Sequence, residues 1–276
     1  MDRIRLIASD MDATLLDEQS QLPADFEETI HALAELGIRF APASGRPLYT
    51  LEAMFPTLRD ELVFIGDNGG AIRWKGQNLF TSEMSPEGWR ALNRLTREQG
   101  DIAVLCGLES AYVERPFAVH DAVLRHFYTK IEYVDRLEDV AAPADKFTIY
   151  LPQHNAQQAY DTVYASQRSI YSVAVAGECW VDIMNPGVHK GAALQTLGQL
   201  WGLPSESIMA FGDTYNDAEM LQTVRYGFLM ENGSEPLRQK VPFLAPSHRE
   251  AGVMQVLHRV LAQNGCVCPE DFVPAH

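Results

Sequence analysis

The chain has 276 residues, 46% of them hydrophobic, with a formal net charge of -15 at pH 7. This negative charge argues against a nucleic-acid surface or an anionic membrane as partner, because both attract clustered Lys and Arg. The length allows a sizeable core in one large domain or two modest ones.

The first predicted elements are buried strands that alternate with an amphipathic helix. Apolar runs predict strands and a 3.6-residue period predicts a helix, at 4–9 (strand), 23–36 (helix), 38–43 (strand) and 62–65 (strand). A strand–helix–strand rhythm of this kind indicates a parallel sheet with helices on its faces.

The pattern changes between residues 83 and 185. Helices are expected at 85–100 and around 119–128, and several strands follow one another without a helix between them, at "DIAVLCG", "AYVERP", "KFTIYLP", "SIYSVAVAG" and "CWVDIMN". Adjacent strands of this kind are typical of antiparallel hairpins. We therefore expect residues 83–185 to form an inserted α+β domain.

The first rhythm returns after residue 186. The expected elements are a helix at 191–201, a strand at 207–211, a helix at 216–224, strands near Tyr226 and Phe243, and a helix at 249–263. The tail "CVCPEDFVPAH" is expected to be irregular. Residues 1–82 and 186–276 then make one discontinuous α/β domain around the insertion.

Polar side chains follow the predicted strands where these end, and one lysine precedes a helix. These residues are Asp10, Asp12, Ser44, Lys190, Asp213, Asn216 and Asp217. The carboxyl ends of parallel strands share one sheet edge, so we expect these groups to meet there. Crowded carboxylates repel one another unless a hard cation such as Mg²⁺ lies between them, and a lysine and a hydroxyl suit phosphoryl oxygens. The predicted chemistry is phosphoryl transfer with a carboxylate as nucleophile.

Four motifs carry a family resemblance. In order along the chain, "DMDATLL", "ASGR", "HKG" and "GDTYND" resemble the motifs of the haloacid dehalogenase superfamily, in its Cof-type phosphatase branch. The segments "CGLESAYV" and "FGDTYNDAEML" are similar to bacterial sugar phosphatases of that branch. The resemblance implies a Rossmann-like parallel-sheet core, with residues 83–185 as a cap that closes over it and sets substrate specificity.

The resemblance also implies roles for the acids. Asp10 matches the nucleophile, which forms an aspartyl-phosphate and also binds Mg²⁺. Asp12 matches the general acid and base and is counted with the metal ligands. Asp213 and Asp217 match the acidic metal ligands that follow the later strand, although Asp217 could instead cap its helix.

Three further residues match phosphoryl-binding positions, namely Ser44, Lys190 and Asn216. Turn geometry explains Arg46, Asp67 and Asn68 about as well as function does. The family usually has Gly where this chain has Ala13. A Cβ there either distorts the acid/base geometry or is tolerated if φ is negative.

The expected function is Mg²⁺-dependent hydrolysis of small phosphorylated metabolites, with sugar phosphates first by resemblance. Pyridoxal phosphate or a flavin mononucleotide stays open as a substrate. A phosphotransferase or mutase, and a non-catalytic phosphate-sensing module, are the alternatives.

The expected partner is a small phosphorylated molecule, with no nucleic acid, membrane or obligate protein partner. We expect a cytoplasmic location, because the apolar stretch before Asp10 is too short for a secretory signal. The four cysteines are then expected to be reduced.

Overall fold

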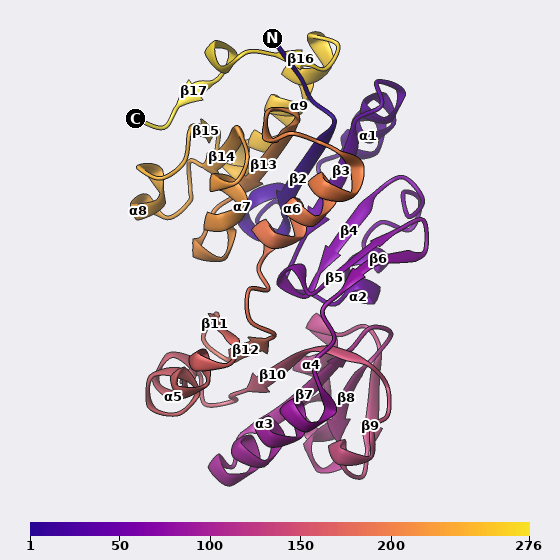
Figure 1. The fold of residues 1–276 in the computed structure, drawn as a ribbon, viewed down its shortest axis with the longest axis vertical. Helices are drawn as coiled ribbons and strands as arrows, with labels where there is room; N and C mark the ends of the chain where they lie inside the picture. The colour runs from indigo at the N-terminus through magenta and orange to yellow at the C-terminus, as the bar shows by residue number, and fades with distance from the viewer.

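The computed structural model describes residues 1–276 and places two sheets one above the other (Figure 1). The larger sheet has nine strands in the order β17-β15-β14-β13-β2-β3-β4-β5-β6. The smaller has six, in the order β11-β12-β10-β7-β8-β9. A two-stranded pair, β1 with β16, lies at the end of the core that bears both termini. The fold is the expected α/β core with a second, inserted sheet.

The core sheet is parallel through its centre, from β15 to β4, with antiparallel strands at both edges. Its strands and the terminal pair are β1 (Asp2–Arg3), β2 (Leu6–Asp10), β3 (Arg39–Ala43), β4 (Val63–Gly66), β5 (Ala71–Trp74), β6 (Gln77–Thr81), β13 (Ile208–Gly212), β14 (Tyr226–Met230), β15 (Phe243–Ala245), β16 (Cys266–Val267) and β17 (Val273–Pro274).

Helices cover both faces of the core sheet because each face presents buried apolar side chains. The helices are α1 (Phe26–Glu35), α2 (Leu48–Ala53), α6 (Lys190–Trp201), α7 (Ala218–Gln222), α8 (Glu235–Arg238) and α9 (Gly252–Ala262). Side chains of α1, α2 and α9 pack in one hydrophobic cluster, and those of α6, α7 and α8 pack in the other. The core is therefore a three-layer sandwich.

The inserted sheet is antiparallel except where β8 runs parallel to β9. Its strands are β7 (Ile102–Gly107), β8 (Ala111–Glu114), β9 (Ile131–Val134), β10 (Ala144–Tyr150), β11 (Ser172–Ala176) and β12 (Trp180–Met184). Helices α3 (Pro86–Gln99) and α5 (Ala156–Thr162) pack on one face, and α4 (Asp121–Phe127) packs on the other. We call this unit the cap.

The chain crosses between the two sheets twice, from β6 to α3 and from β12 to α6. The two crossings are hydrogen-bonded to each other: Asn185 Nδ2 donates to the carbonyl oxygen of Ser82 at 3.2 Å and to that of Glu83 at 2.8 Å. The boundaries expected at residues 83 and 185 fall within these crossings.

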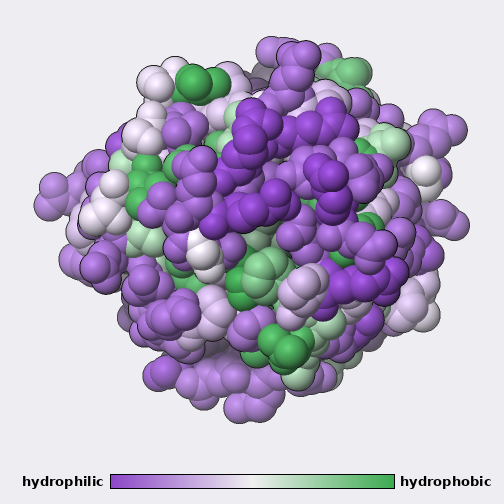
Figure 2. Space-filling view, turned by 90° about the horizontal axis from the view of Figure 1, so that it is seen from below, coloured by the Kyte–Doolittle hydropathy of each residue, from purple (hydrophilic) through white to green (hydrophobic).

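The outer end of the cap is largely hydrophilic, with hydrophobic areas scattered over it (Figure 2). The cap's exposed large apolar side chains are Val119, Val123 and Ile170. No helix in the structure has the length and apolar character needed to cross a bilayer.

One sequence expectation needs correction, and two elements were not predicted. The tail is not irregular, because β16 pairs with β1 and β17 pairs with β15. The hairpin β5–β6 extends the core sheet beyond the third expected strand, with its turn at Lys75 and Gly76, both at positive φ. The short buried helix α2 follows the "ASGR" motif, where no helix was expected.

Candidate active site

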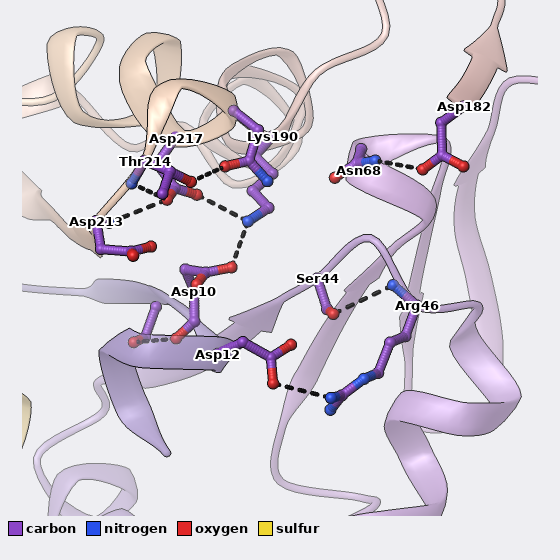
Figure 3. Close-up of polar contacts among 12 residues, drawn as sticks. Asp10, Asp12, Ser44, Arg46, Asn68, Asp182, Lys190, Asp213, Thr214 and Asp217 are labelled. Atoms are coloured by element: carbon purple, nitrogen blue, oxygen red, sulfur yellow. Dashed lines mark hydrogen bonds and ion pairs between the residues drawn. The ribbon is translucent and has the colours of Figure 1, made fainter. Parts of the chain in front are cut away.

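The groups singled out in the sequence gather at the carboxyl edge of the core sheet (Figure 3). Asp10 is the last residue of β2, and Asp213 directly follows β13. Lys190 is the first residue of α6, so its position is fixed by the crossing that returns from the cap. Segments far apart in the chain thus deliver charged side chains to one place.

Three carboxylates form the centre of this edge. One oxygen from each of Asp10, Asp213 and Asp217 lies within 4.8 Å of the others, and all three residues are buried. Lys190 Nζ donates to Asp10 Oδ1 and, at 2.7 Å, to Asp217 Oδ1. We call Asp10, Asp213 and Asp217 the carboxylate triad.

The Asp217 carboxylate accepts hydrogen bonds from the local backbone in addition to its place in the triad. Its Oδ2 accepts hydrogen bonds from the backbone N–H of Asp213 at 3.0 Å and from that of Thr214 at 3.2 Å. The same carboxylate therefore caps the turn before α7 and receives Lys190. The sequence left open a metal-ligand role or a helix cap for Asp217; its side chain caps the turn before α7 and not α7 itself, and the metal-ligand role stays a prediction.

Burial dominates the electrostatics of the triad. It raises the pKa of Asp10, Lys190 opposes this shift, and the negative charges of Asp217 and Asp213 add to it. Burial and the neighbouring Asp217 raise the pKa of Asp213 to about 6, against the opposing effect of Lys190. Burial lowers the pKa of Lys190, but Asp10 and Asp217 together outweigh it, so the net shift is upward. One ammonium does not fully compensate three buried acids.

The donor set of the triad fits Mg²⁺. Its ligand atoms are carboxylate oxygens from the end of β2 and from the turn between β13 and α7, and oxygen ligands are the ones that this hard cation prefers. Burial first, and the neighbouring negative charges second, raise the pKa values of Asp10 and Asp213, so added positive charge here would favour their ionised forms. A divalent cation at this point would supply that charge.

A cavity of about 770 Å³ lies between the core loops and the cap, lined by residues next to the triad in the chain, such as Asp12 and Thr214, and not by the triad itself. Asp12, Ser44 and Asn216 line it from the core side. The Asp12 carboxylate accepts a hydrogen bond from Arg46 Nη2 at 2.8 Å, and Ser44 Oγ accepts one from the backbone N–H of Arg46 at 3.1 Å. Asp12 and Ser44 therefore face the space where a substrate would lie.

Comparison with known proteins agrees with this geometry. The family model described as haloacid dehalogenase-like hydrolase matches residues 7–257. The chain belongs to the haloacid dehalogenase-like hydrolase family.

Relatives with assigned names are phosphatases. The chain is 31% identical over 262 residues to the 5-amino-6-(5-phospho-D-ribitylamino)uracil phosphatase YbjI of Escherichia coli, covering 94% of this chain and 96% of that protein. It is 31% identical over 249 residues to the HMP-PP phosphatase of Cronobacter sakazakii, covering 87% and 89%. This haloacid dehalogenase-like chain is accordingly a phosphatase.

A solved structure supports the same fold. The crystal structure of SMU.1108c from Streptococcus mutans superposes with a TM-score of 0.84 at 28% identity, covering 94% of this chain and 99% of that one. The fold of core and cap is thus shared across nearly the whole length of both chains.

Two of the expected site residues outside the triad, Asp12 and Asn216, keep roles that stay predictions in this haloacid dehalogenase-like phosphatase. Asp12 points to Arg46 and not to the three carboxylates, so its role as a metal ligand stays a prediction. Asn216 Oδ1 accepts from Thr214 Oγ1 at 2.6 Å and lines the cavity. Its contact with a phosphoryl group also stays a prediction.

Ala13 adopts a left-handed backbone, with φ 58° and ψ 14°. Of the two alternatives that the sequence left open, tolerance through a negative φ does not apply, because φ is positive here. The turn after Asp12 keeps the backbone geometry that a glycine would adopt freely, and the Cβ imposes a cost there.

Sequence reasoning missed several residues of the site. Arg46 was not connected to Asp12, although both follow neighbouring parallel strands. His189 caps α6 by accepting the backbone N–H of Ala192 through Nδ1 at 3.1 Å. Lys146 and Asp182 line the cavity from the cap. The signals for them were Lys146 and Thr148 alternating with apolar residues in β10, and one charged residue in the otherwise apolar β12.

Proposed function

We propose that this phosphatase hydrolyses small phosphorylated metabolites, sugar phosphates first, with Mg²⁺ and through an aspartyl-phosphate on Asp10. The observation that carries the proposal is the convergence of the carboxylate triad with Lys190 at the end of β2, beside a cavity that Asp12 lines.

In the first step an oxygen of Asp10 bonds to phosphorus while the ester P–O bond breaks. Asp12 gives its proton to the departing alkoxide, which leaves as an alcohol. Lys190 lies against the attacking carboxylate, where its charge stabilises the phosphoryl oxygens. Ser44, at the cavity wall, donates a hydrogen bond to one of them.

In the second step water attacks the phosphorus of the aspartyl-phosphate. Asp12 takes the proton from that water, the Asp10–phosphorus bond breaks, and inorganic phosphate leaves. Both aspartates then return to their starting protonation states. Asp10, Asp213 and Asp217 would hold Mg²⁺, which would supply positive charge for the phosphoryl oxygens.

The cap and the relatives support a metabolite-sized substrate. A cavity of about 770 Å³ holds a leaving group of the size of a sugar or a heterocycle. The named relatives act on a phosphoribitylamino-uracil and on HMP-PP. Both names fit small phosphorylated metabolites, and the first contains a phosphorylated sugar-alcohol chain.

The test is phosphate release from a panel of sugar phosphates, nucleotides and phosphorylated cofactors, with Mg²⁺ and with chelator. We expect Mg²⁺-dependent release concentrated on sugar phosphates, and none with chelator. Asp10→Asn should abolish turnover and leave the melting temperature close to that of the unchanged protein. Turnover by Asp10→Asn would remove Asp10 as nucleophile.

The same assay separates the alternatives. Transfer of phosphate to an added alcohol in preference to water would favour a phosphotransferase. A folded protein that releases no phosphate from any member of the panel would favour the phosphate-sensing module. Release confined to pyridoxal phosphate or flavin mononucleotide would keep the mechanism and move the substrate class to cofactors.

A further inference from the structure

One face of the cap sheet carries polar side chains in the middle of an apolar structure. Thr148 on β10 lies opposite Asp182 on β12, and Lys146 lies two residues before Thr148 on the same strand. Alternation along a strand places Lys146 and Thr148 on one face, and Phe147 with Ile149 on the other. The apolar pair packs in the hydrophobic cluster under α3 and α5.

The polar face looks into the same cavity as the catalytic loops. Lys146, Thr148 and Asp182 are buried in the protein and line the cavity that Asp12 and Ser44 line from the core side. The cap therefore presents a polar surface to the part of a substrate that lies beyond its phosphate.

Protein contacts hold the Asp182 carboxylate in a fixed orientation (Figure 3). Thr148 Oγ1 donates to its Oδ1 at 2.7 Å, and Asn68 Nδ2, from the core, donates to its Oδ2 at 3.3 Å. Lys146 Nζ lies 3.6 Å from the same Oδ2.

The donors around Asp182 are already engaged. The ammonium of Lys146 donates to the carbonyl oxygen of Gly45 at 2.6 Å and pairs with Asp67 Oδ1 at 2.9 Å, in addition to Asp182. The Thr148 hydroxyl gives its only proton to Asp182. Asp182 Oδ1 accepts only the Thr148 hydrogen bond within the protein and so keeps a lone pair, and the buried Asn68 Oδ1 has no hydrogen-bond partner. The subsite thus offers acceptors, and a ligand there must bring donors.

The charges and the aromatic lining of the cavity restrict the class of ligand further. The single positive charge of Lys146 faces the negative charges of Asp67 and Asp182, so a second phosphate on the substrate would be repelled. Phe127, Tyr128 and Trp180 line the same cavity and offer aromatic surface for the apolar faces of a ring or a chain. Hydroxyl donors on a carbon skeleton match both features.

We propose that Asp182, positioned by Thr148 and Lys146, is the specificity-determining residue of the cap: it accepts hydrogen bonds from the hydroxyl groups of a sugar or sugar-alcohol monophosphate and disfavours bisphosphates. The inference rests on the proposed phosphatase function and deepens it by naming the subsite that selects the leaving group.

The test measures binding without turnover. Asp10→Asn protein with Mg²⁺ is titrated calorimetrically with D-ribose 5-phosphate, D-glucose 6-phosphate, D-glucose 1,6-bisphosphate and phenyl phosphate. We expect at least one of the two sugar monophosphates to bind more tightly than phenyl phosphate and than the bisphosphate. Two ratios are compared: the affinity for the sugar monophosphate relative to phenyl phosphate, and relative to the bisphosphate. Adding Asp182→Asn should reduce the first ratio about tenfold to a hundredfold, because a charge-assisted hydrogen bond is lost.

The affinity for the bisphosphate distinguishes loss of a recognition contact from loss of the folded structure. Removing the negative charge of Asp182 should improve bisphosphate binding relative to the sugar monophosphate, a gain that unfolding would not produce. Glu132→Gln, on the exposed side of β9, is the matched control. It should change neither the affinity ratio of sugar monophosphate to phenyl phosphate nor that of sugar monophosphate to bisphosphate. Melting temperatures report whether each variant is folded.

Two results would overturn the inference: phenyl phosphate binding as tightly as both sugar monophosphates, or unchanged ratios in Asp182→Asn. Failure of the proposed function is seen separately, as absence of phosphate release by the protein with native Asp10. Binding preferences that depend on Asp182 without any turnover would keep the subsite and reject the phosphatase mechanism.

Discussion

Ala13 places a Cβ in a backbone conformation that costs about 1–2 kcal/mol for a residue other than glycine. Ala13→Gly removes that cost. It also raises the conformational entropy of the unfolded chain, which offsets about 0.4–1 kcal/mol of the gain in stability. We expect the free energy of unfolding to rise by about 0.5–1 kcal/mol, measured by urea titration. Ala32→Gly, inside α1, is the control and should lower it by about 1 kcal/mol. A loss of stability in Ala13→Gly would contradict the strain at this turn.

Asp213 makes Mg²⁺ binding depend on pH. Its pKa of about 6 means that a proton occupies this ligand in much of the metal-free protein below pH 6, and the metal must displace it. Affinity should therefore rise as pH rises, by about tenfold between pH 5 and pH 7 from this group. Calorimetry in buffers of different ionisation enthalpy would show the released proton.

Asp213→Asn provides the comparison for that titration. The variant should bind Mg²⁺ more weakly at pH 7 and lose this group's part of the pH dependence. An affinity that is the same at pH 5 and pH 7 in the unchanged protein would remove Asp213 from the metal site.

At the level of single residues, sequence identified the triad and Lys190 because strand ends and motif order place them together. It did not connect Asp12 with Arg46, because that contact depends on side-chain direction across two loops. It also could not give the sign of φ at Ala13, which the packing of the turn determines.

Among the secondary-structure elements, α6 packs closely against α7 through a glycine. A Cβ on Gly191 would lie 2.7 Å from the backbone carbonyl carbon of Glu219, too close for an unshifted helix. We expect Gly191→Ala to lower the free energy of unfolding by about 1–2 kcal/mol. Because Lys190 is the neighbouring residue, phosphate release should also fall, by about tenfold or more.

Gly198 in the same helix provides the matched control. A Cβ there would lie 3.3 Å from the carbonyl oxygen of Leu203, and alanine favours the helix by up to about 1 kcal/mol. Gly198→Ala should therefore stay within about 1 kcal/mol of the unchanged protein in urea unfolding. Equal losses in the two variants would show that helix propensity, and not the approach of α7, decides the outcome.

The long periodic elements were predictable from sequence, and the short ones were not. The helix expected at 23–36 is α1, and the strand expected at 207–211 is β13, each within a few residues. By contrast, α2 has no hydrophobic period to reveal it, because nearly all of its side chains are buried. The strands β16 and β17 are two residues long and exist through pairing with distant segments.

For the whole molecule, the hydrogen bonds of Asn185 join the two crossings between core and cap. Asn185→Ala removes the donor to Ser82 and Glu83 and should lower the free energy of unfolding by about 1 kcal/mol. The looser crossings should also be cleaved faster by a protease at low concentration, with the sites identified by mass spectrometry.

Asn78→Ala is the matched control, because Asn78 accepts a hydrogen bond from Arg73 at the edge of the core sheet, on β6. It should not accelerate cleavage at the crossings. Equal cleavage of Asn185→Ala and the unchanged protein would mean that Asn185 does not restrain the cap.

Sequence predicted the two-unit organisation from a change of rhythm, yet not the way the cap serves the site. The alternation of Lys146, Phe147 and Thr148 shows that β10 has one polar face, but only the register with β12 places Asp182 beside Thr148. The strand order of both sheets likewise depends on pairing between remote segments.

The adjacency of the two crossings also bears on how such a molecule can arise. Ser82 and Asn185 are hydrogen-bonded neighbours, so the core chain leaves and re-enters at nearly one point. A gene segment encoding a cap could be exchanged there for another without lengthening or reordering any strand of the core. A single reaction centre can in this way acquire different caps during evolution, and the two crossings are also the place to insert a foreign cap by design.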